Sequence, residues 1–292
     1  MSGTLSLEQR YLALMSRIEQ AAQAAGRDPA DVRLLAVSKT FAAGSIQELA
    51  AAGQLAFGEN YLQEALGKMA ALRHLRPGGA EFAERAMPGE EPTREPSGEP
   101  GLRGPAELAR LLALSEGSSR RALEWHFIGP IQSNKTRKIA ESFDWVQSVD
   151  ALKIAQRLSD QRPFHLPPLN ICLQVNVSGE ASKSGCRPEE VVTLAQEVAR
   201  LPNLRLRGLM AIPEPTDDPA LQASRFSQVR ELFNAVRDSA SAATESEGRH
   251  PDPLCIDTLS MGMSADLESA IANGATLVRV GSALFGERPQ PR

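Results

Sequence analysis

Lys39 is the residue of this sequence whose position most favours covalent chemistry. It follows one serine and the four consecutive apolar residues 34–37, and a short unbroken apolar run is typical of a strand buried on both faces. The lysine would then lie at the carboxyl end of that strand, where parallel α/β folds bind their ligands. A desolvated lysine amine loses its proton readily and forms a Schiff base with a carbonyl group. The alternative is a lysine that marks a strand end and points into solvent.

Two loops near the end of the sequence combine small residues with hydroxyl groups. They follow the last two predicted strands and read SMGMS at residues 260–264 and RVGSA at residues 279–283. Small residues let backbone N–H groups approach an anion, and the hydroxyls add further donors. The two loops together predict a phosphate site. The alternative for each loop is a simple cap and turn, in which Ser264 is the N-cap of the next helix.

Arg279 and His126 each interrupt an apolar strand pattern. Because a strand turns successive side chains to opposite faces, Arg279 could point into the mouth of a barrel as a fixed cation. The alternative is an ion pair with a neighbouring carboxylate. His126 stands among aromatic residues, where a packed histidine with one hydrogen-bonded nitrogen is the plainer interpretation.

These residues must be positioned by elements that alternate along the chain. The expected strands are residues 33–38, 55–60, 125–129, 145–149, 169–177, 206–212, 256–261 and 276–281. The expected helices are residues 5–25, 45–52, 61–75, 133–142, 151–158, 188–200, 220–243 and 264–273. This alternation predicts a single-domain (β/α)8 TIM barrel over residues 1–292. An open doubly wound sheet is the alternative, but it would more often carry a GxGxxG turn, and this sequence has none near its start.

One segment, from residue 76 to about residue 120, breaks the alternation. It interleaves prolines and glycines with glutamates, a composition that disfavours regular elements and offers little apolar surface to offset the entropy of ordering. We expect a disordered, acidic surface insertion with room for one short helix at 106–114. It would lie on the side of the barrel that faces away from the ligand.

The composition argues against several functional classes. The 292 residues carry a formal net charge of −4, and the pI is near 5.7, which disfavours a nucleic-acid-binding protein. No apolar run approaches the roughly 18 residues of a membrane helix, and the charged N-terminal segment reads as a helix and not as a signal peptide. Cys172, Cys186 and Cys255 are widely spaced, so we expect reduced thiols in a cytoplasmic protein, with neither a zinc site nor a disulfide framework.

A Schiff-base lysine, a phosphate site and an arginine in one barrel mouth together predict pyridoxal 5'-phosphate as the cofactor. The motifs that hold these residues resemble the pyridoxal phosphate homeostasis protein family. They are AVSKT at 36–40, FGENYLQE at 57–64, WHFIGPIQSNK at 125–135, LSMGMSAD at 259–266 and RVGSALFG at 279–286. They occur in this order over nearly the whole chain, which makes the resemblance specific.

The resemblance implies the barrel of the alanine racemase N-terminal domain. The cofactor-binding residues that it implies are Lys39 as the Schiff base, Ser264, Gly281 and Ser282 at the phosphate, Arg279 at the pyridine nitrogen, and Asn60 and Met261 along the pocket. It leaves open whether His126 and Tyr61 touch the cofactor. The acidic insertion departs from the family pattern, which makes the same connection more compactly.

The resemblance also implies a monomeric carrier and buffer of pyridoxal phosphate, with apoenzymes that require the cofactor as its partners and no nucleic acid or membrane among them. An arginine at the pyridine nitrogen leaves that nitrogen unprotonated, so the ring is a poor electron sink. Racemases with this feature use a tyrosine from a separate C-terminal domain, whereas this chain ends soon after Gly286 and has two tyrosines, Tyr11 and Tyr61. We therefore expect no robust catalytic activity. The alternatives are an amino-acid racemase of weak, broad activity that depends on pyridoxal phosphate, and a Schiff-base aldolase that uses Lys39 on a phosphorylated sugar.

Overall fold

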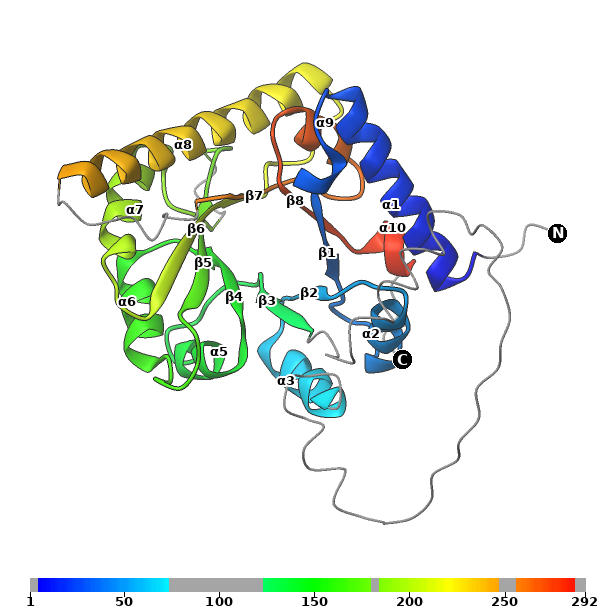
Figure 1. The fold of residues 1–292 in the computed structure, drawn as a ribbon, viewed down its shortest axis with the longest axis horizontal. Coiled ribbons are helices and arrows are strands. Elements are labelled where there is room, and N and C mark those ends of the chain that lie inside the picture. Colours follow the sequence, from blue (N-terminus) through cyan, green and yellow to red (C-terminus); the bar gives the residue numbers. More distant parts are fainter. Residues whose placement is uncertain (1–4, 74–122, 180–183, 247–255, 287–292) are drawn as a thin grey trace, which may run out of the picture.

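The computed structural model describes residues 5–73, 123–179, 184–246 and 256–286. These residues form a closed barrel of parallel strands with helices around the outside (Figure 1). The strands are β1 (Arg33–Val37), β2 (Ala56–Glu59), β3 (Glu124–Phe127), β4 (Trp145–Val149), β5 (Leu169–Val175), β6 (Leu204–Ala211), β7 (Thr258–Ser260) and β8 (Leu277–Val280). The helices are α1 (Leu7–Ala24), α2 (Ala43–Ala51), α3 (Leu62–Ala71), α5 (Thr136–Ser142), α6 (Leu152–Gln161), α7 (Val191–Ala199), α8 (Pro219–Ser246), α9 (Leu267–Ala272) and α10 (Ser282–Phe285).

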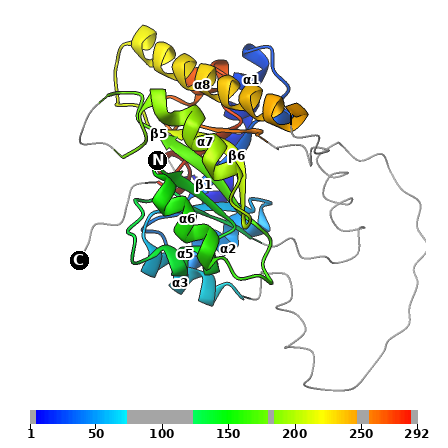
Figure 2. The ribbon, with the colours of Figure 1, turned by 90° about the vertical axis from the view of Figure 1, so that its left-hand side faces the viewer.

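The barrel closes because the first strand pairs with the last. The strands stand around the barrel in chain order, and β1 pairs in parallel with β8, with Leu34 opposite Val278. Helices α5, α6 and α7 lie side by side along one flank of the sheet (Figure 2). The predicted (β/α)8 barrel is confirmed, and the alternative of an open doubly wound sheet is wrong.

Side-chain alternation divides each strand between two environments. In β1, Leu34 and Ala36 belong to the main hydrophobic cluster, which also holds the helix residues. Leu35 instead packs with Ala56 and Leu277 in a separate small cluster. Because successive residues of a strand face opposite sides, the odd-numbered residues of β1 face the barrel interior and the even-numbered ones face the helices.

The barrel interior also contains a row of buried polar side chains. Gln147 of β4 accepts a hydrogen bond from Ser260 of β7 at 2.7 Å, and these strands are not neighbours in the barrel. A bond between them can therefore form only across the interior. His126 and Arg279 are buried there as well, so the row runs through the middle of the barrel.

Most of the predicted elements agree with the structure to within a few residues, and one difference concerns the predicted site residue Ser264. The sequence predicts a helix that begins at Ser264, but α9 begins at Leu267 and Asp266 occupies its N-cap position. The carboxylate of Asp266 accepts a hydrogen bond from the backbone N–H of Met263 at 2.5 Å. The prediction of Ser264 as the N-cap is therefore wrong, because the hydroxyl of Ser264 bonds to a different loop.

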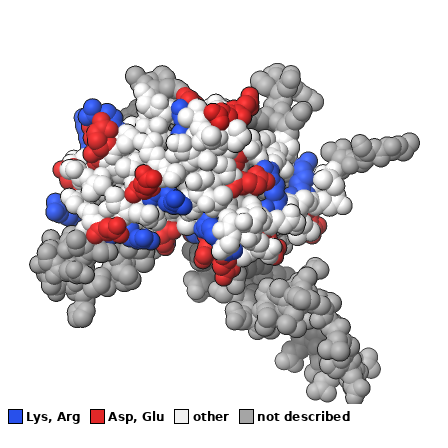
Figure 3. Space-filling view, turned by 90° about the horizontal axis from the view of Figure 1, so that it is seen from above, with Lys and Arg blue, Asp and Glu red and all other residues white. Residues whose placement is uncertain are grey.

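Two further predictions concern the surface. The acidic insertion of residues 76–120 lies outside the described residues. Within the ranges described above, none of the helices has both the length and the apolar character needed to cross a bilayer. On the face seen in Figure 3, basic and acidic side chains are interspersed and form no continuous basic stripe among the described residues.

Candidate functional site

Lys39 follows β1 directly at the carboxyl end of the strand. It is half-buried, and it continues the odd-numbered residues of β1 that face the interior. The strand alternation therefore assigns Lys39 to the mouth of the barrel. Carboxyl ends of barrel strands are where ligands bind in this architecture.

The backbone on both sides of Lys39 is held by four side chains that we call the Lys68 cluster: Ser38, Glu59, Glu64 and Lys68. The Lys68 ammonium donates to the Ser38 carbonyl at 2.7 Å, to Glu59 Oε1 at 2.7 Å and to Glu64 Oε1 at 2.6 Å. The Ser38 hydroxyl also donates to Glu59 Oε1, at 2.6 Å. On the other side of Lys39, the Thr40 N–H donates to Glu64 Oε1 at 2.5 Å. The cluster therefore fixes the peptide before and after the lysine.

The charges of the Lys68 cluster are largely removed from water. The side chains of Lys68 and Glu59 are 7% and 0% exposed. Burial raises the pKa of the Glu59 carboxyl, although hydrogen bonds from Lys68 and Ser38 oppose this change. The chain also accepts a strained conformation here, because Thr40 has φ of 69°, a region that β-branched residues rarely adopt. Such strain persists only where the surroundings over-determine the backbone.

Arg279 lies in β8 and is 4% exposed. Its Nη1 donates to the Ser260 hydroxyl at 2.8 Å, and its Nη2 donates to the Ala211 carbonyl at 2.9 Å. Burial lowers the pKa of the guanidinium to about 10, so Arg279 stays charged at neutral pH. Both of these acceptors are neutral, so the guanidinium keeps its full charge inside the barrel.

The two predicted phosphate loops meet at Ser264. The Ser282 hydroxyl and the Ala283 N–H both approach Ser264 Oγ, at 3.2 Å and 3.3 Å. From outside, Arg17 of α1 donates to the Ser264 carbonyl at 3.0 Å. Gly281 lies against β1, because a Cβ there would come within 3.3 Å of the Val37 carbonyl oxygen. The structure thus brings three of the predicted residues, 264, 281 and 282, next to one another and next to β1.

The remaining predicted residues differ in their surroundings. The Asn60 side chain has a buried Oδ1 with no hydrogen-bond partner among the described residues, so this amide can bond to a ligand. Met261 is fully buried in the main hydrophobic cluster. Tyr61 is 57% exposed at the end of β2.

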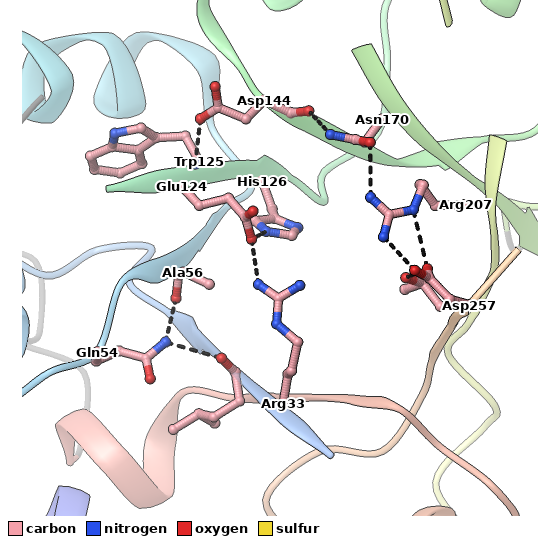
Figure 4. Close-up of polar contacts among 12 residues, drawn as sticks. Arg33, Gln54, Ala56, Glu124, Trp125, His126, Asp144, Asn170, Arg207 and Asp257 are labelled. Atoms are coloured by element: carbon pink, nitrogen blue, oxygen red, sulfur yellow. Dashed lines mark hydrogen bonds and ion pairs between the residues drawn. The ribbon is translucent and has the colours of Figure 1, made fainter. Parts of the chain in front are cut away.

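His126 is buried in the barrel interior. Its Nε2 is 2.8 Å from Glu124 Oε1, and its Nδ1 is 2.8 Å from Gln147 Nε2. Glu124 in turn accepts from Arg33 at 2.7 Å, and Figure 4 shows these three residues pointing toward one another. Because Glu124 and Arg33 begin their strands, this contact lies at the amino-terminal end of the barrel. The expected packed histidine therefore has hydrogen bonds on both nitrogens.

A second polar network at that end joins other strands. Asn170 donates to the Asp144 carbonyl at 3.1 Å and accepts from Arg207 at 3.1 Å, and Arg207 forms an ion pair with Asp257 (Figure 4). These groups are paired with one another. Polar contacts at the amino-terminal end of a barrel usually serve stability.

Metal and thiol chemistry find little support in the residues described. Those residues contain no group of three or more histidine, cysteine or acidic side chains that could hold a metal ion. Burial raises the pKa of the Cys172 and Cys186 thiols to about 12, so both are inert as nucleophiles. Cys255 lies outside the described residues.

The sequence analysis missed the partners that position the site. Glu64 and Lys68 are four residues apart on α3, which is the spacing of a helical ion pair, and this signal was available. Glu59, a carboxylate at the carboxyl end of β2, was a second signal for a charged cluster beside Lys39. By contrast, Gln147 lies in an ordinary apolar strand pattern, and nothing in its spacing points to Ser260, 113 residues away.

The residues present fit pyridoxal phosphate. An amine, two adjoining hydroxyls, a buried cation and an unpartnered amide oxygen all belong to one barrel. These are the groups that an aldehyde, a phosphate and a pyridine nitrogen require.

Comparisons with known proteins identify the family to which the chain is similar. The family model "Alanine racemase, N-terminal domain" matches residues 11–289. A Pseudomonas aeruginosa protein named "Pyridoxal phosphate homeostasis protein" is 54% identical over 273 residues, which cover 94% of this chain and 92% of that protein. The structure of PipY of Synechococcus elongatus with pyridoxal phosphate bound has a TM-score of 0.66 at 29% identity, covering 96% of this chain and 100% of that one. The same protein without the cofactor has a TM-score of 0.69 at 30% identity, with the same coverage.

Proposed function

Because this chain belongs to the pyridoxal phosphate homeostasis protein family, we propose that it binds pyridoxal 5'-phosphate on Lys39 as a Schiff base and acts as a carrier and buffer of that cofactor. When bound, the cofactor supplies an aldehyde that condenses with an amine and a ring that withdraws electrons. The observation that carries the proposal is the convergence of three strand ends. Lys39 follows β1, Ser264 follows β7, and Gly281 and Ser282 follow β8, at one end of one barrel.

Each residue has a separate task. Lys39 supplies the amine, and the Lys68 cluster fixes the backbone on either side of it. The hydroxyls of Ser264 and Ser282 lie 3.2 Å apart and donate to the phosphate, to which the Gly281 backbone lies adjacent. Asn60 supplies an amide at the pocket wall, and Met261 contributes apolar packing behind the loop.

Arg279 explains why we propose a carrier and not an enzyme. A guanidinium can only donate hydrogen bonds, so a pyridine nitrogen beside Arg279 must accept and stays unprotonated. The charge of Arg279 persists at neutral pH, because burial lowers its pKa only to about 10. An unprotonated ring is a weak electron sink, which suits storage of the cofactor better than turnover.

The proposed carrier is a cytoplasmic monomer that supplies apoenzymes requiring pyridoxal phosphate. The buried reduced cysteines Cys172 and Cys186 are consistent with the cytoplasm.

The visible absorption spectrum of the purified protein tests the cofactor and its lysine together. After addition of pyridoxal phosphate, we expect a yellow Schiff-base band in the wild type that is lost in Lys39→Ala. Lys138 is a matched control because its side chain is 63% exposed, so Lys138→Ala should retain the band. A wild type that stays colourless would contradict the proposal and favour the Schiff-base aldolase.

Weak racemase activity is the second candidate, and Tyr61 is the observation that favours it. This phenol is 57% exposed and directly follows Asn60 at the carboxyl end of β2, where a second acid or base would need to lie. A racemase predicts turnover of D- and L-amino acids that disappears in Tyr61→Phe. The carrier predicts no turnover above that of free pyridoxal phosphate in either protein.

A further inference from the structure

We propose that His126, Gln147 and Ser260 are positioning residues for Arg279, and that Glu124, which is ion-paired with Arg33 at the far end of the barrel, anchors the row of hydrogen bonds that they form. The inference rests on the proposed function only in one respect, the assignment of Arg279 to the cofactor ring. The connection itself is a property of this chain's own side chains.

The five side chains form one continuous row through the barrel. Arg279 Nη1 donates to Ser260 Oγ at 2.8 Å, and Ser260 donates to Gln147 Oε1 at 2.7 Å. Gln147 Nε2 is 2.8 Å from His126 Nδ1, and His126 Nε2 is 2.8 Å from Glu124 Oε1. The row links β8, β7, β4 and β3. His126, Gln147 and Ser260 are each 0% exposed.

The two ends of the row, together with a neutral His126, determine the direction of every bond. A carboxylate only accepts and a guanidinium only donates, and hydrogen bonds from His126 and Arg33 outweigh burial to lower the pKa of Glu124 to about 2. His126 must therefore carry its proton on Nε2 and accept on Nδ1. Gln147 then donates with its amino group and accepts with its carbonyl oxygen. Ser260 donates to that oxygen and accepts from Arg279, so all the bonds point from the arginine to the glutamate.

His126 stays neutral in this arrangement. Burial lowers its pKa, although the bond to Glu124 opposes that change, and the row needs Nδ1 as an acceptor. A protonated imidazole would place two N–H donors face to face at the Gln147 amide. The neutral Nε2–H tautomer is the one form that satisfies both neighbours.

A row of aligned hydrogen bonds has an electrostatic consequence. Each bond polarises the next one, so the row makes Ser260 Oγ a stronger hydrogen-bond acceptor for the buried guanidinium. A carboxylate placed directly against Arg279 would neutralise the cation at the site. The neutral intermediates hold Arg279 in place while its charge remains available to a ring nitrogen.

A matched pair of substitutions tests the inference. Gln147→Leu breaks the row, whereas Gln54→Leu removes another buried amide, whose Nε2 donates to the Leu34 and Ala56 carbonyls and has no link to Arg279 (Figure 4). We expect Gln147→Leu to bind pyridoxal phosphate about tenfold more weakly than wild type, which is the scale of one buried hydrogen bond. We also expect its Schiff-base band to move, and we expect Gln54→Leu to keep both the affinity and the band. Equal effects in the two variants, or none in Gln147→Leu, would overturn the inference.

A second measurement does not require the cofactor. The chain has four histidines, so the ring nitrogens of His126 can be assigned by nitrogen-15 NMR of the full-length protein. We expect a neutral ring with its proton on Nε2, and a change at Nδ1 in Gln147→Leu and in the smaller variant Ser260→Ala. A charged ring, or a proton on Nδ1, would overturn the direction of the row. Ser260→Ala also covers the case in which Gln147→Leu does not fold.

The proposed function fails separately from this inference. A wild type that forms no Schiff-base band contradicts the carrier, and the NMR result for His126 still decides whether the row exists. A wild type that binds the cofactor, with equal affinity in Gln147→Leu, leaves the carrier intact and removes the positioning role.

Discussion

The two halves of the candidate site are held in different ways. Around Lys39, the Lys68 cluster uses formal charges, since one ammonium contacts two carboxylates and a carbonyl. Around Arg279, the hydrogen-bond partners are a hydroxyl and a carbonyl, and the row of hydrogen bonds that begins there ends at a carboxylate at the other end of the barrel. In the first half, the charged side chains bind the backbone on either side of Lys39, and the Lys39 side chain itself is assigned to the mouth of the barrel. In the second half the functional side chain is itself the charge, so its close partners are neutral.

This difference has consequences for stability and for binding. Loss of a charge from the Lys68 cluster leaves buried ions without partners, which costs stability. Loss of Gln147 or another neutral side chain of the row leaves the Arg279 guanidinium less well positioned, which weakens the binding of pyridoxal phosphate. The following substitutions examine the comparison in order of expected effect.

Lys68→Met should produce the largest loss of stability. It leaves Glu59 buried beside no cation, and Glu59 Oε2 already has no hydrogen-bond partner among the described residues. We expect the free energy of unfolding to fall by about 3 kcal/mol, as for other broken buried pairs, and chemical denaturation measures it. Lys138→Met is the control, because its exposed pair with Glu141 should contribute less than about 0.5 kcal/mol. Equal losses would show that the Lys68 cluster contributes no more than a surface pair.

Glu124→Gln should remove a pH-dependent contribution to stability from the row of hydrogen bonds that joins Glu124 to Arg279. The pKa of Glu124 is lowered from 4.5 to about 2, so its ionised form stabilises the fold above pH 4.5, and that contribution is lost as pH falls toward 2. We expect wild type to exceed Glu124→Gln by about 2 kcal/mol in unfolding free energy near pH 7, with the difference vanishing near pH 2.

The control for this titration is Glu141→Gln, because the side chain of Glu141 is 31% exposed, about as much as that of Glu124, but its partner Lys138 is 63% exposed. The unfolding free energy of Glu141→Gln should differ little from that of wild type at every pH. The buried Glu59 makes a contribution to stability with the opposite pH dependence. Its pKa is raised, so its ionisation lowers the free energy of unfolding as pH rises. A difference in unfolding free energy between wild type and Glu124→Gln that grows on acidification would contradict the assignment of Glu124 as an ionised carboxylate at the end of the row.

Thr40→Gly should have the smallest effect. Glycine adopts φ of 69° without strain, but it also has more conformational freedom to lose on folding. The two effects oppose each other, so we expect the unfolding free energy to change by less than about 1 kcal/mol. A larger loss would mean that the threonine side chain itself supports the Lys68 cluster.

The sequence was sufficient to predict the barrel and to place Lys39 and the two loops at the carboxyl ends of its strands. Short apolar runs such as residues 34–37 identify strands, and the alternation with helices identifies the parallel barrel. Lys39 and the two loops were found because strand ends are visible in the local sequence. The sequence was not sufficient for Ser264, whose hydroxyl bonds to the loop after β8 and not to its own helix.

Local sequence therefore determined the elements, their order and the residues at their carboxyl ends, because apolar periodicity and strand length act over a few neighbouring residues. Tertiary structure decided which polar side chains meet inside the barrel. Gln147 and Ser260 come from non-neighbouring strands, and only closure of the sheet through β1 and β8 sets the register that brings them within 2.7 Å. The direction of the row then follows from its two charged ends, Arg279 and Glu124, which no local pattern connects.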